Sequence, residues 1–178
     1  MLGPETLDLW TAGIGGYHTY RIPALEMTTT GSVLAFCEGR RDGSGDSGQI
    51  DLLMRRSDDG GRTWGQSHVI ATEPGMTCGN PAPVLDRQAG TIWLPFCKNR
   101  ADRDEAMIRK GLAPRTVWVT RSDDDGASWA DPVEITAVVK HPGWTWYATG
   151  PCHGIQLRSG RLVVPCDFRS QDPVTGAE

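Results

Sequence analysis

The 178-residue sequence has no long apolar run, and this absence excludes several classes of protein. No apolar stretch approaches the roughly 18 residues that a membrane-spanning helix needs. The start, MLGPETLDLW, shows neither the basic nor the apolar segment of a signal peptide, so no export signal is visible and the compartment stays unknown. A net charge of -4 disfavours a nucleic-acid partner, because neutralising phosphates requires a basic face.

Cysteine pairs at short spacing are missing as well. The five cysteines form no CxxC pair, and their odd number leaves at least one thiol unpaired. A zinc site is therefore disfavoured, since zinc ligands come in such pairs. Cys37 and Cys97 lie in apolar, strand-like runs, where we expect buried free thiols.

A sustained helical period is absent, and short apolar stretches recur in its place. They are rich in Val, Ile, Leu and Trp and are separated by Gly, Asp, Pro and Ser, which is typical of many short strands. The 22 glycines and 12 prolines also disfavour long helices. The sequence therefore predicts an all-β protein with strands at YRIPAL, SVLAFCEG, DLLMRRS, PAPVLD, TIWLPFC, TVWVTRS, GIQLRSG and RLVVPCDF.

An internal repeat gives the organisation of these strands. SDDGGRTW (57–64) and SDDDGASW (122–129) share the pattern S-x-D-x-G-x-[T/S]-W. The chemistry suits a hairpin turn, in which the aspartate accepts backbone N–H bonds and the glycine takes a positive φ. We expect a structural role for the repeated residues, namely Ser57, Asp59, Gly61, Thr63, Trp64, Ser122, Asp124, Gly126, Ser128 and Trp129.

The repeated pattern resembles the Asp-box of sialidases and related β-propellers. A second repeat, YRIPAL, GNPAPVLD and GPCHGIQL, opens three successive units, as inner strands of propeller blades would. Counting from His153, a third Asp-box is expected at roughly position 190. The resemblance thus implies a six-bladed propeller, of which residues 1–178 supply about two and a half N-terminal blades of a longer catalytic domain.

YRIPAL also matches the Arg-Ile-Pro motif that opens the catalytic domain of sialidases (exo-α-neuraminidases) of the bacterial type. The segments AFCEGRRDGSGDSGQIDLLMRRSDDGGRTW, GNPAPVLD and WTWYATGPCHGIQL are similar to family stretches too, so the resemblance covers about residues 14–169. It implies that Arg21 belongs to an arginine triad that holds the substrate carboxylate, a role suited to a planar, permanently charged guanidinium. A structural ion pair is the alternative for Arg21.

The acidic loop RRDGSGDSGQID (40–51) holds the expected acid/base. The family places an arginine after the second strand and an aspartate five or six residues later, which selects Arg40 and Asp46. The resemblance implies that Asp46 protonates the leaving oxygen and then activates water, while Arg40 contacts the sugar near its C4 hydroxyl. Asp42 and Asp51 are the competing carboxylates, and Asp51 opens the next strand, where a turn or ladder role is favoured.

Further substrate contacts follow from the same resemblance. Asn80 corresponds to a position near the C4 hydroxyl, with a cap or turn role as the alternative. Asp167 and Arg169 match a rim position, and Trp146 and Tyr147 are candidates for the N-acetyl region, although aromatic residues in a propeller more often belong to the core. His153 is expected to be structural.

The family uses a tyrosine nucleophile activated by a glutamate, because an attacking carboxylate would repel the substrate's own carboxylate. Tyr17, Tyr20 and Tyr147 do not match that pair, which is expected beyond Glu178 with the other two arginines. The resemblance therefore implies a retaining exo-sialidase that acts on sialylated glycans without metal or cofactor, and a fragment that is inactive alone. A non-catalytic binding propeller and a trans-sialidase are the alternatives.

Overall fold

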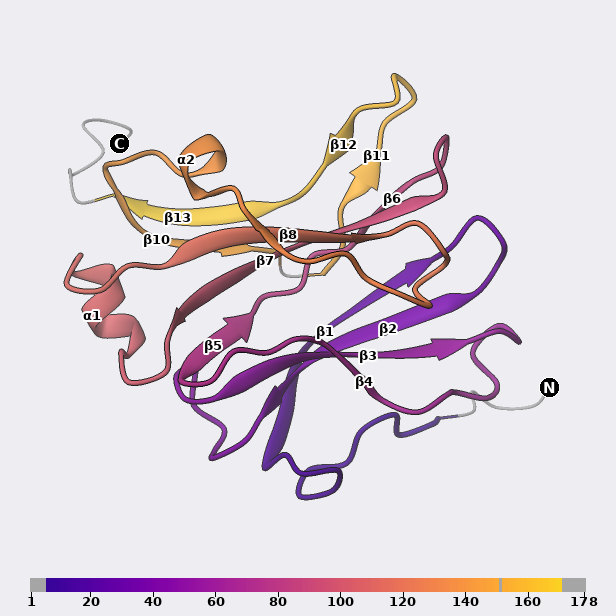
Figure 1. The fold of residues 1–178 in the computed structure, drawn as a ribbon, viewed down its shortest axis with the longest axis horizontal. Coiled ribbons are helices and arrows are strands. Elements are labelled where there is room, and N and C mark those ends of the chain that lie inside the picture. The colour runs from indigo at the N-terminus through magenta and orange to yellow at the C-terminus, as the bar shows by residue number, and fades with distance from the viewer. Residues whose placement is uncertain (1–5, 151, 171–178) are drawn as a thin grey trace.

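The structure is a computed structural model that describes residues 6–150 and 152–170. Its regular structure is almost entirely β-strand, in three successive groups that run from bottom to top in Figure 1. The all-β class predicted from the short apolar runs is confirmed, and each of the eight expected stretches overlaps a strand. Two short helices, α1 (Glu105–Arg109) and α2 (Thr136–Val139), were not predicted, because one helical turn leaves no periodic signal.

The first group is a four-stranded antiparallel meander. Each strand pairs with its neighbour in sequence, so the group reads as a single propeller-like blade. The odd residues of the third strand face one side and the even residues the other, as the pleat requires. The strands are β1 (Thr19–Met27), β2 (Val33–Arg40), β3 (Ile50–Ser57) and β4 (His68–Ala71).

The second group repeats this arrangement with an inner strand in two halves. Both halves pair antiparallel with the same long strand, which pairs onward to two more. One parallel bridge, between Ile50 and Thr77, connects it to the first group. The strands are β5 (Met76–Gly79), β6 (Val84–Asp86), β7 (Thr91–Arg100), β8 (Thr116–Ser122) and β9 (Val133–Glu134).

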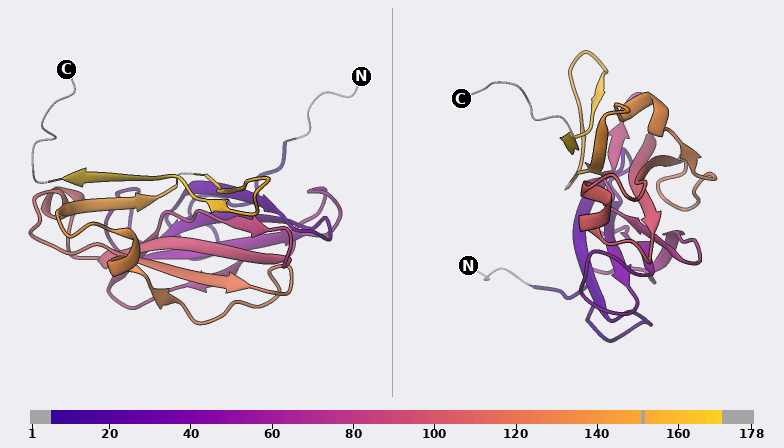
Figure 2. Two further views of the ribbon diagram at one scale, coloured as in Figure 1. Left: turned by 90° about the horizontal axis from the view of Figure 1, so that it is seen from above. Right: turned by 90° about the vertical axis from the view of Figure 1, so that its left-hand side faces the viewer.

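The third group is smaller and lies along the second (Figure 2). It contains β10 (Trp144–Thr149), β11 (Ile155–Gln156), β12 (Leu162–Val163) and β13 (Cys166–Ser170). β10 pairs antiparallel with β13, and β11 pairs antiparallel with β12. Here too the inner strand is split, into β10 and β11.

A positive φ precedes the proline in each inner strand. Ile22 (φ 55°), Asn80 (φ 58°) and Gly150 (φ 78°) come directly before Pro23, Pro81 and Pro151, the last of which lies outside the described residues. Ladder pairing is interrupted after each of these residues. Pro23 and Pro81 therefore mark a break within the inner strand, and the second and third units begin earlier than GNPAPVLD and GPCHGIQL predict, at Met76 and Trp144.

The main core joins the first group to the second. Phe36 and Leu34 of β2 are almost fully buried and pack in one cluster with Ile92 and Leu94 of β7. Burying such side chains supplies about 1.5–3 kcal/mol each relative to full exposure. A second cluster, of Cys97, Val117 and Tyr147, joins the second group to β10. Cys37 and Cys97 are buried free thiols, as expected.

The two Asp-box segments connect the third and fourth strands of the first two groups and share one hydrogen-bond pattern. In the first, Asp59 accepts bonds from Ser57 and from the backbone and hydroxyl of Thr63, and the Trp64 indole donates to Gly61 O. In the second, Asp124 accepts the corresponding bonds from Ser122 and Ser128. Both carboxylates accept hydrogen bonds from within their own turns, so these segments stabilise the hairpins.

Candidate active site

A cavity of about 240 Å³ lies where the three strand groups meet. It is lined by polar side chains from separate parts of the chain, together with aliphatic groups from β1 and β3. The polar lining includes Glu38, Arg40, Asp46, Asn80, Arg115 and Trp146. Four of the residues singled out in the sequence therefore line one cavity, namely Arg40, Asp46, Asn80 and Trp146.

Arg40 and Glu38 form a buried ion pair at the end of β2. Their side chains are 3% and 4% exposed, and Glu38 Oε2 accepts from both Nε and Nη2 of Arg40. The two residues are two positions apart on one strand, so their side chains share a face. The remaining Arg40 nitrogen, Nη1, donates to Ser44 O, Gly45 O and Asp46 Oδ1. Arg40 thus anchors the loop that carries Asp46.

Asp46 stands at the mouth of the cavity between two arginines. Its Oδ1 atom accepts from Arg40 Nη1 and from Arg21 Nη1, both at 2.8 Å. Its side chain is 51% exposed, and its Oδ2 atom makes no hydrogen bond with any residue that the structure describes. One carboxylate oxygen is fixed and the other is open, which suits a group that exchanges a proton with a ligand.

The electrostatics of Asp46 favour the ionised form. Partial burial raises the pKa of the Asp46 carboxyl, but hydrogen bonds from Arg40 and the charges of Arg40 and Arg21 outweigh this effect. The net result is a pKa below the usual range of an aspartate. A carboxyl that is to donate a proton near neutral pH needs the opposite shift, so a change in its surroundings must accompany proton donation.

Arg21 owes its position to the break in β1. It precedes Ile22, a β-branched residue at φ 55°, and the β1–β2 register shifts between Arg21 and Ala24. A branched residue at positive φ is a backbone outlier, and such strain gathers at functional sites. The Arg21 side chain is 43% exposed and donates to Ser44 O and Asp46 Oδ1, both in the loop after β2.

Asn80 and Arg115 form a second polar wall. The backbone N–H of Asn80 donates to Glu38 Oε1, and the side-chain oxygen of Asn80 accepts from Arg115 Nη2. Arg115, directly before β8, is 4% exposed and also donates to Asn99 Oδ1. Sequence reasoning missed Glu38 and Arg115. The alternation of β2 could have indicated Glu38, whereas no local pattern indicates Arg115.

The competing carboxylates of the loop differ from Asp46 in their surroundings. Asp42 is exposed, and Asp51 is fully buried. Asp51 accepts hydrogen bonds from Thr72, Tyr17, Gln49 and Arg41, which lower its pKa against the raising effect of burial. Both oxygens of Asp51 are occupied, and Asp51 pairs with Gly39 in the β2–β3 ladder, so its role is structural, as its position at the start of the strand predicts.

The rim candidates lie elsewhere. Asp167 and Arg169 are exposed on β13 and do not line the cavity. Tyr147 is buried in the core, and His153 contacts Leu25 O at 3.2 Å. The cavity instead contains a pair from α1, whose Glu105 and Arg109 form an ion pair one turn apart.

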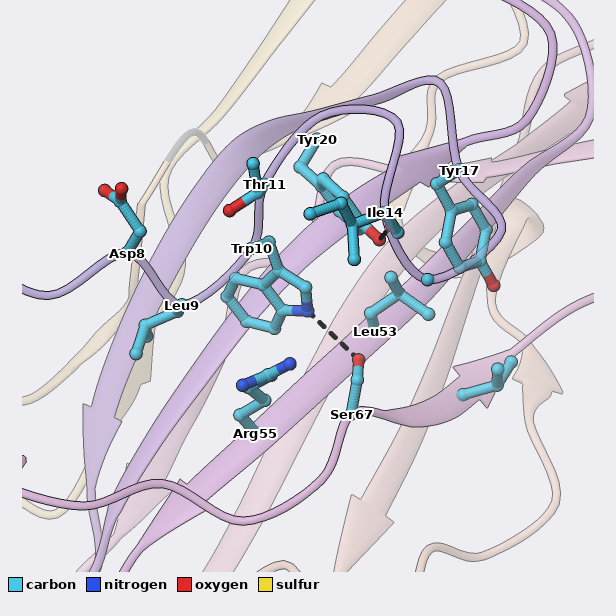
Figure 3. A pocket seen from close by; sticks show the side chains of 12 residues that line it. Asp8, Leu9, Trp10, Thr11, Ile14, Tyr17, Tyr20, Leu53, Arg55 and Ser67 are labelled. Carbon is cyan, nitrogen blue, oxygen red and sulfur yellow. Dashed lines mark hydrogen bonds between the residues drawn. The ribbon is translucent and has the colours of Figure 1, made fainter.

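A second cavity, of about 340 Å³, lies on the other face of β3 (Figure 3). Trp10, Tyr20 and Leu53 form its walls, and the Trp10 indole donates to Ser67 Oγ at 3.0 Å. The guanidinium carbon of Arg55 lies over the Trp10 ring, 5.7 Å from the ring centre. Asp46 does not line this second cavity, and Arg21 lines neither of the two.

Within residues 6–150 and 152–170, no group of three or more histidine, cysteine or acidic side chains is placed to hold a metal ion. Over the same residues, no helix is long and apolar enough to cross a membrane.

Comparison with known proteins supplies the family. The model of the BNR repeat-like domain matches residues 31–176. An exo-alpha-sialidase of Aspergillus fumigatus is 35% identical over 96% of this chain and 45% of its own length. A sialidase of Micromonospora viridifaciens is 35% identical over 88% of this chain and 26% of its own length.

Among solved structures, the Hadza microbial sialidase Hz136 superposes with a TM-score of 0.82 at 30% identity. The match covers 90% of this chain and 34% of that protein. The chain therefore spans less than half the length of the sialidases that it matches here. By the extent of the domain match, the chain belongs to the BNR repeat-like domain family, and its similarity within that family is to sialidases.

Proposed function

We propose that the chain is the N-terminal part of the catalytic domain of an exo-α-sialidase, which releases terminal α-linked sialic acid from glycoconjugates. The observation that carries this proposal is the position of Asp46, held at a cavity mouth by two arginines with one oxygen free. The similarity to sialidases of a fungus and a bacterium supports it. The first two strand groups and the partial third correspond to two and a half blades of a six-bladed propeller.

In this proposal Arg21 is one member of the group that binds the substrate carboxylate. It is half-exposed, and only its Nη1 atom is engaged by the residues that the structure describes. The other nitrogens are free to bind a carboxylate in the bidentate geometry that arginine prefers. Two further arginines and the tyrosine nucleophile with its glutamate lie outside residues 1–178.

Substrate binding then adjusts Asp46 for its task. A substrate carboxylate on Arg21 competes with Asp46 for the same guanidinium and adds a negative charge nearby. Both effects raise the pKa of Asp46, because a carboxyl loses acidity when its cation is taken and an anion approaches. Asp46 then donates its proton from Oδ2 to the leaving glycosidic oxygen, while the tyrosine, which loses its proton to its glutamate, forms a bond to the anomeric carbon. Asp46, now a carboxylate, takes a proton from the water that displaces the tyrosine, and the tyrosine regains its proton from the glutamate, so hydrolysis proceeds with retention.

The test uses Asp46→Asn in the complete enzyme. The amide keeps the shape of the side chain and cannot donate a carboxyl proton, so turnover of natural sialosides should fall about 10²–10⁴-fold. An aryl sialoside with a good leaving group should lose less, since its departure needs less protonation. Kinetics with both substrates measure the difference.

Asp42→Asn is the matched control, because Asp42 lies in the same loop and is exposed. It should leave turnover of both substrates near wild type. Equal losses of turnover for the two substrates in Asp46→Asn, or near-normal activity of this variant, would contradict the assignment of Asp46 as the acid/base. A wild-type protein that binds sialic acid without cleaving any sialoside would identify a binding propeller instead.

A further inference from the structure

Arg115 is a buried cation without a buried anion beside it. The residue is 4% exposed. Its guanidinium donates to the neutral amide oxygens of Asn99, at 3.0 Å, and Asn80. Among the described residues no carboxylate forms an ion pair with it. Its guanidinium carbon also lies 5.4 Å from the centre of the Trp146 ring. Buried charges are usually paired with an opposite charge, so an arginine held by two amides and an aromatic ring requires another explanation.

The donor and acceptor groups of the two amides that hold Arg115 have fixed orientations. The Asn99 amide nitrogen donates to Arg100 O, which leaves its oxygen to accept from Arg115. Arginine can only donate, so the group that Asn80 turns toward Arg115 must be its oxygen. The NH₂ group of Asn80 therefore points away from Arg115, and it makes no hydrogen bond with any described residue.

The backbone of Asn80 is held independently. Its N–H donates to Glu38 Oε1 at 2.9 Å, and its carbonyl accepts from Thr149 Oγ1 at 2.6 Å. The left-handed φ of 58° is one that asparagine tolerates better than most residues. With backbone and side-chain oxygen fixed, the NH₂ group is left as the part of Asn80 that is available on the cavity wall.

We infer that Arg115 is a positioning residue, which fixes the side-chain amide of Asn80 so that Asn80 presents a hydrogen-bond donor to an acceptor oxygen of the substrate. The inference rests on the proposed function and deepens it. The NH₂ group of Asn80 is thus the donor that this wall offers a ligand, since the unpartnered Nε of Arg115 and Nε1 of Trp146 are buried. A hydroxyl or carbonyl oxygen fits such a wall, and a second donor does not.

The test is a double-mutant cycle in the complete enzyme with Arg115→Met, Asn80→Ala and the double variant. Loss of one substrate hydrogen bond should lower kcat/KM of each single variant about 3- to 10-fold, mainly through KM. If Arg115 acts through Asn80, the double variant should be no worse than Asn80→Ala, since coupled residues are not additive. Among sialosides that each lack one oxygen, one should lose affinity for the wild type and not for either single variant, which identifies the acceptor.

Arg121→Met is the matched control, because Arg121 lies on the adjoining strand β8, pairs with Asp123 and is half-exposed. Its KM should equal that of the wild type. If the decreases in kcat/KM of the two single variants multiply in the double variant, the inference is overturned. A wild-type protein that turns over no sialoside would instead overturn the proposed function.

A measurement on the wild type covers the case in which Arg115→Met fails to fold. The side-chain NH₂ signals of Asn80, followed by nitrogen-15 NMR, should shift when sialic acid is added. Unchanged signals on addition of sialic acid to an active enzyme would contradict the orientation inferred for Asn80.

Discussion

At the scale of single residues, Arg21 and Arg40 share one oxygen of Asp46 but bind it differently. Arg40 is buried and makes five hydrogen bonds to Glu38 and the loop, whereas Arg21 is half-exposed and reaches the loop from β1. Arg40 therefore sets the place of Asp46, and Arg21 can change partner without disturbing the loop.

This difference predicts how the acidity of Asp46 responds to Arg21→Met. Removing the Arg21 cation leaves partial burial, which raises the pKa, opposed by Arg40 alone. The pKa of Asp46 should therefore rise in the variant. Carbon-13 NMR titration of the Asp46 carboxyl in both proteins measures the shift. A pKa that stays the same or falls would contradict the substrate-linked change proposed for Asp46.

The buried pair predicts a stability effect at Arg40. Arg40→Met leaves the Glu38 carboxylate buried without its cation, which typically costs about 3–5 kcal/mol of the free energy of unfolding. Arg100→Met removes an exposed pair with Asp102 and should leave the free energy of unfolding close to that of the wild type. Urea unfolding of the two variants checks the contrast, and similar costs would refute it.

The sequence could predict the residues of this site that lie in one short motif. Arg40 and Asp46 are six positions apart in a loop that a family pattern identifies, and the cavity brings them together. Arg115 is 35 positions from Asn80, and their contact depends on how β5 and β8 flank β7. No local pattern encodes such a contact, because it arises only once the sheet has formed.

At the scale of elements, apolar runs predicted the strands better than their limits. YRIPAL predicts Pro23 inside an inner strand, as β1 has it, whereas GNPAPVLD and GPCHGIQL predict later starts for the second and third inner strands than β5 and β10 show. Proline lacks an N–H and interrupts the ladder wherever it lies, so its position alone could not separate an end from a break. β4, β9 and both helices, of two to five residues, were too short to give a pattern.

The two Asp-box glycines offer a matched comparison. Gly61 (φ 89°) and Gly126 (φ 82°) both occupy the left-handed region, where alanine costs roughly 1–2 kcal/mol. An added Cβ at Gly61 would meet only the Trp64 ring at 3.8 Å, whereas at Gly126 it would meet Leu34 at 2.8 Å. Gly126→Ala should therefore be more destabilising, by about 1–3 kcal/mol, since overpacking adds to the strain. Thermal unfolding compares the variants, and equal Tm values would count against the clash.

The Asp-box carboxylates predict a loss of stability in acid. Hydrogen bonds from Ser128, then from Ser122, lower the pKa of Asp124 to about 2, and bonds from Thr63 lower that of Asp59. A lowered folded pKa stabilises the protein above the unfolded value near 4, and this contribution is lost as the pH falls toward 2.

Replacing both carboxylates, in Asp59→Asn with Asp124→Asn, should lower stability at neutral pH and flatten its dependence between about pH 4 and pH 2. Urea unfolding at a series of pH values measures this slope. A double variant that keeps the wild-type slope would assign the acid sensitivity to other carboxyls.

At the scale of the whole molecule, the cavity exists only where the strand groups meet. Asp46 comes from the first group, Asn80 and Arg115 from the second, and Trp146 from the third. The cluster containing Phe36 and Leu94 holds the first two groups together. The site therefore depends on the packing of whole sheets, which explains why the sequence indicated its members and not their arrangement.

Glu38 connects these groups in a second way. Its carboxylate binds Arg40 of its own strand and the Asn80 N–H of the next group, and it fills the space beside Gly79. A Cβ at Gly79 would lie 2.5 Å from Glu38 Oε1. Positions 38 and 79 should therefore covary among relatives. A relative with a larger residue at position 79 should have a shorter side chain at position 38. Such a relative should also hold its acidic loop by a different contact.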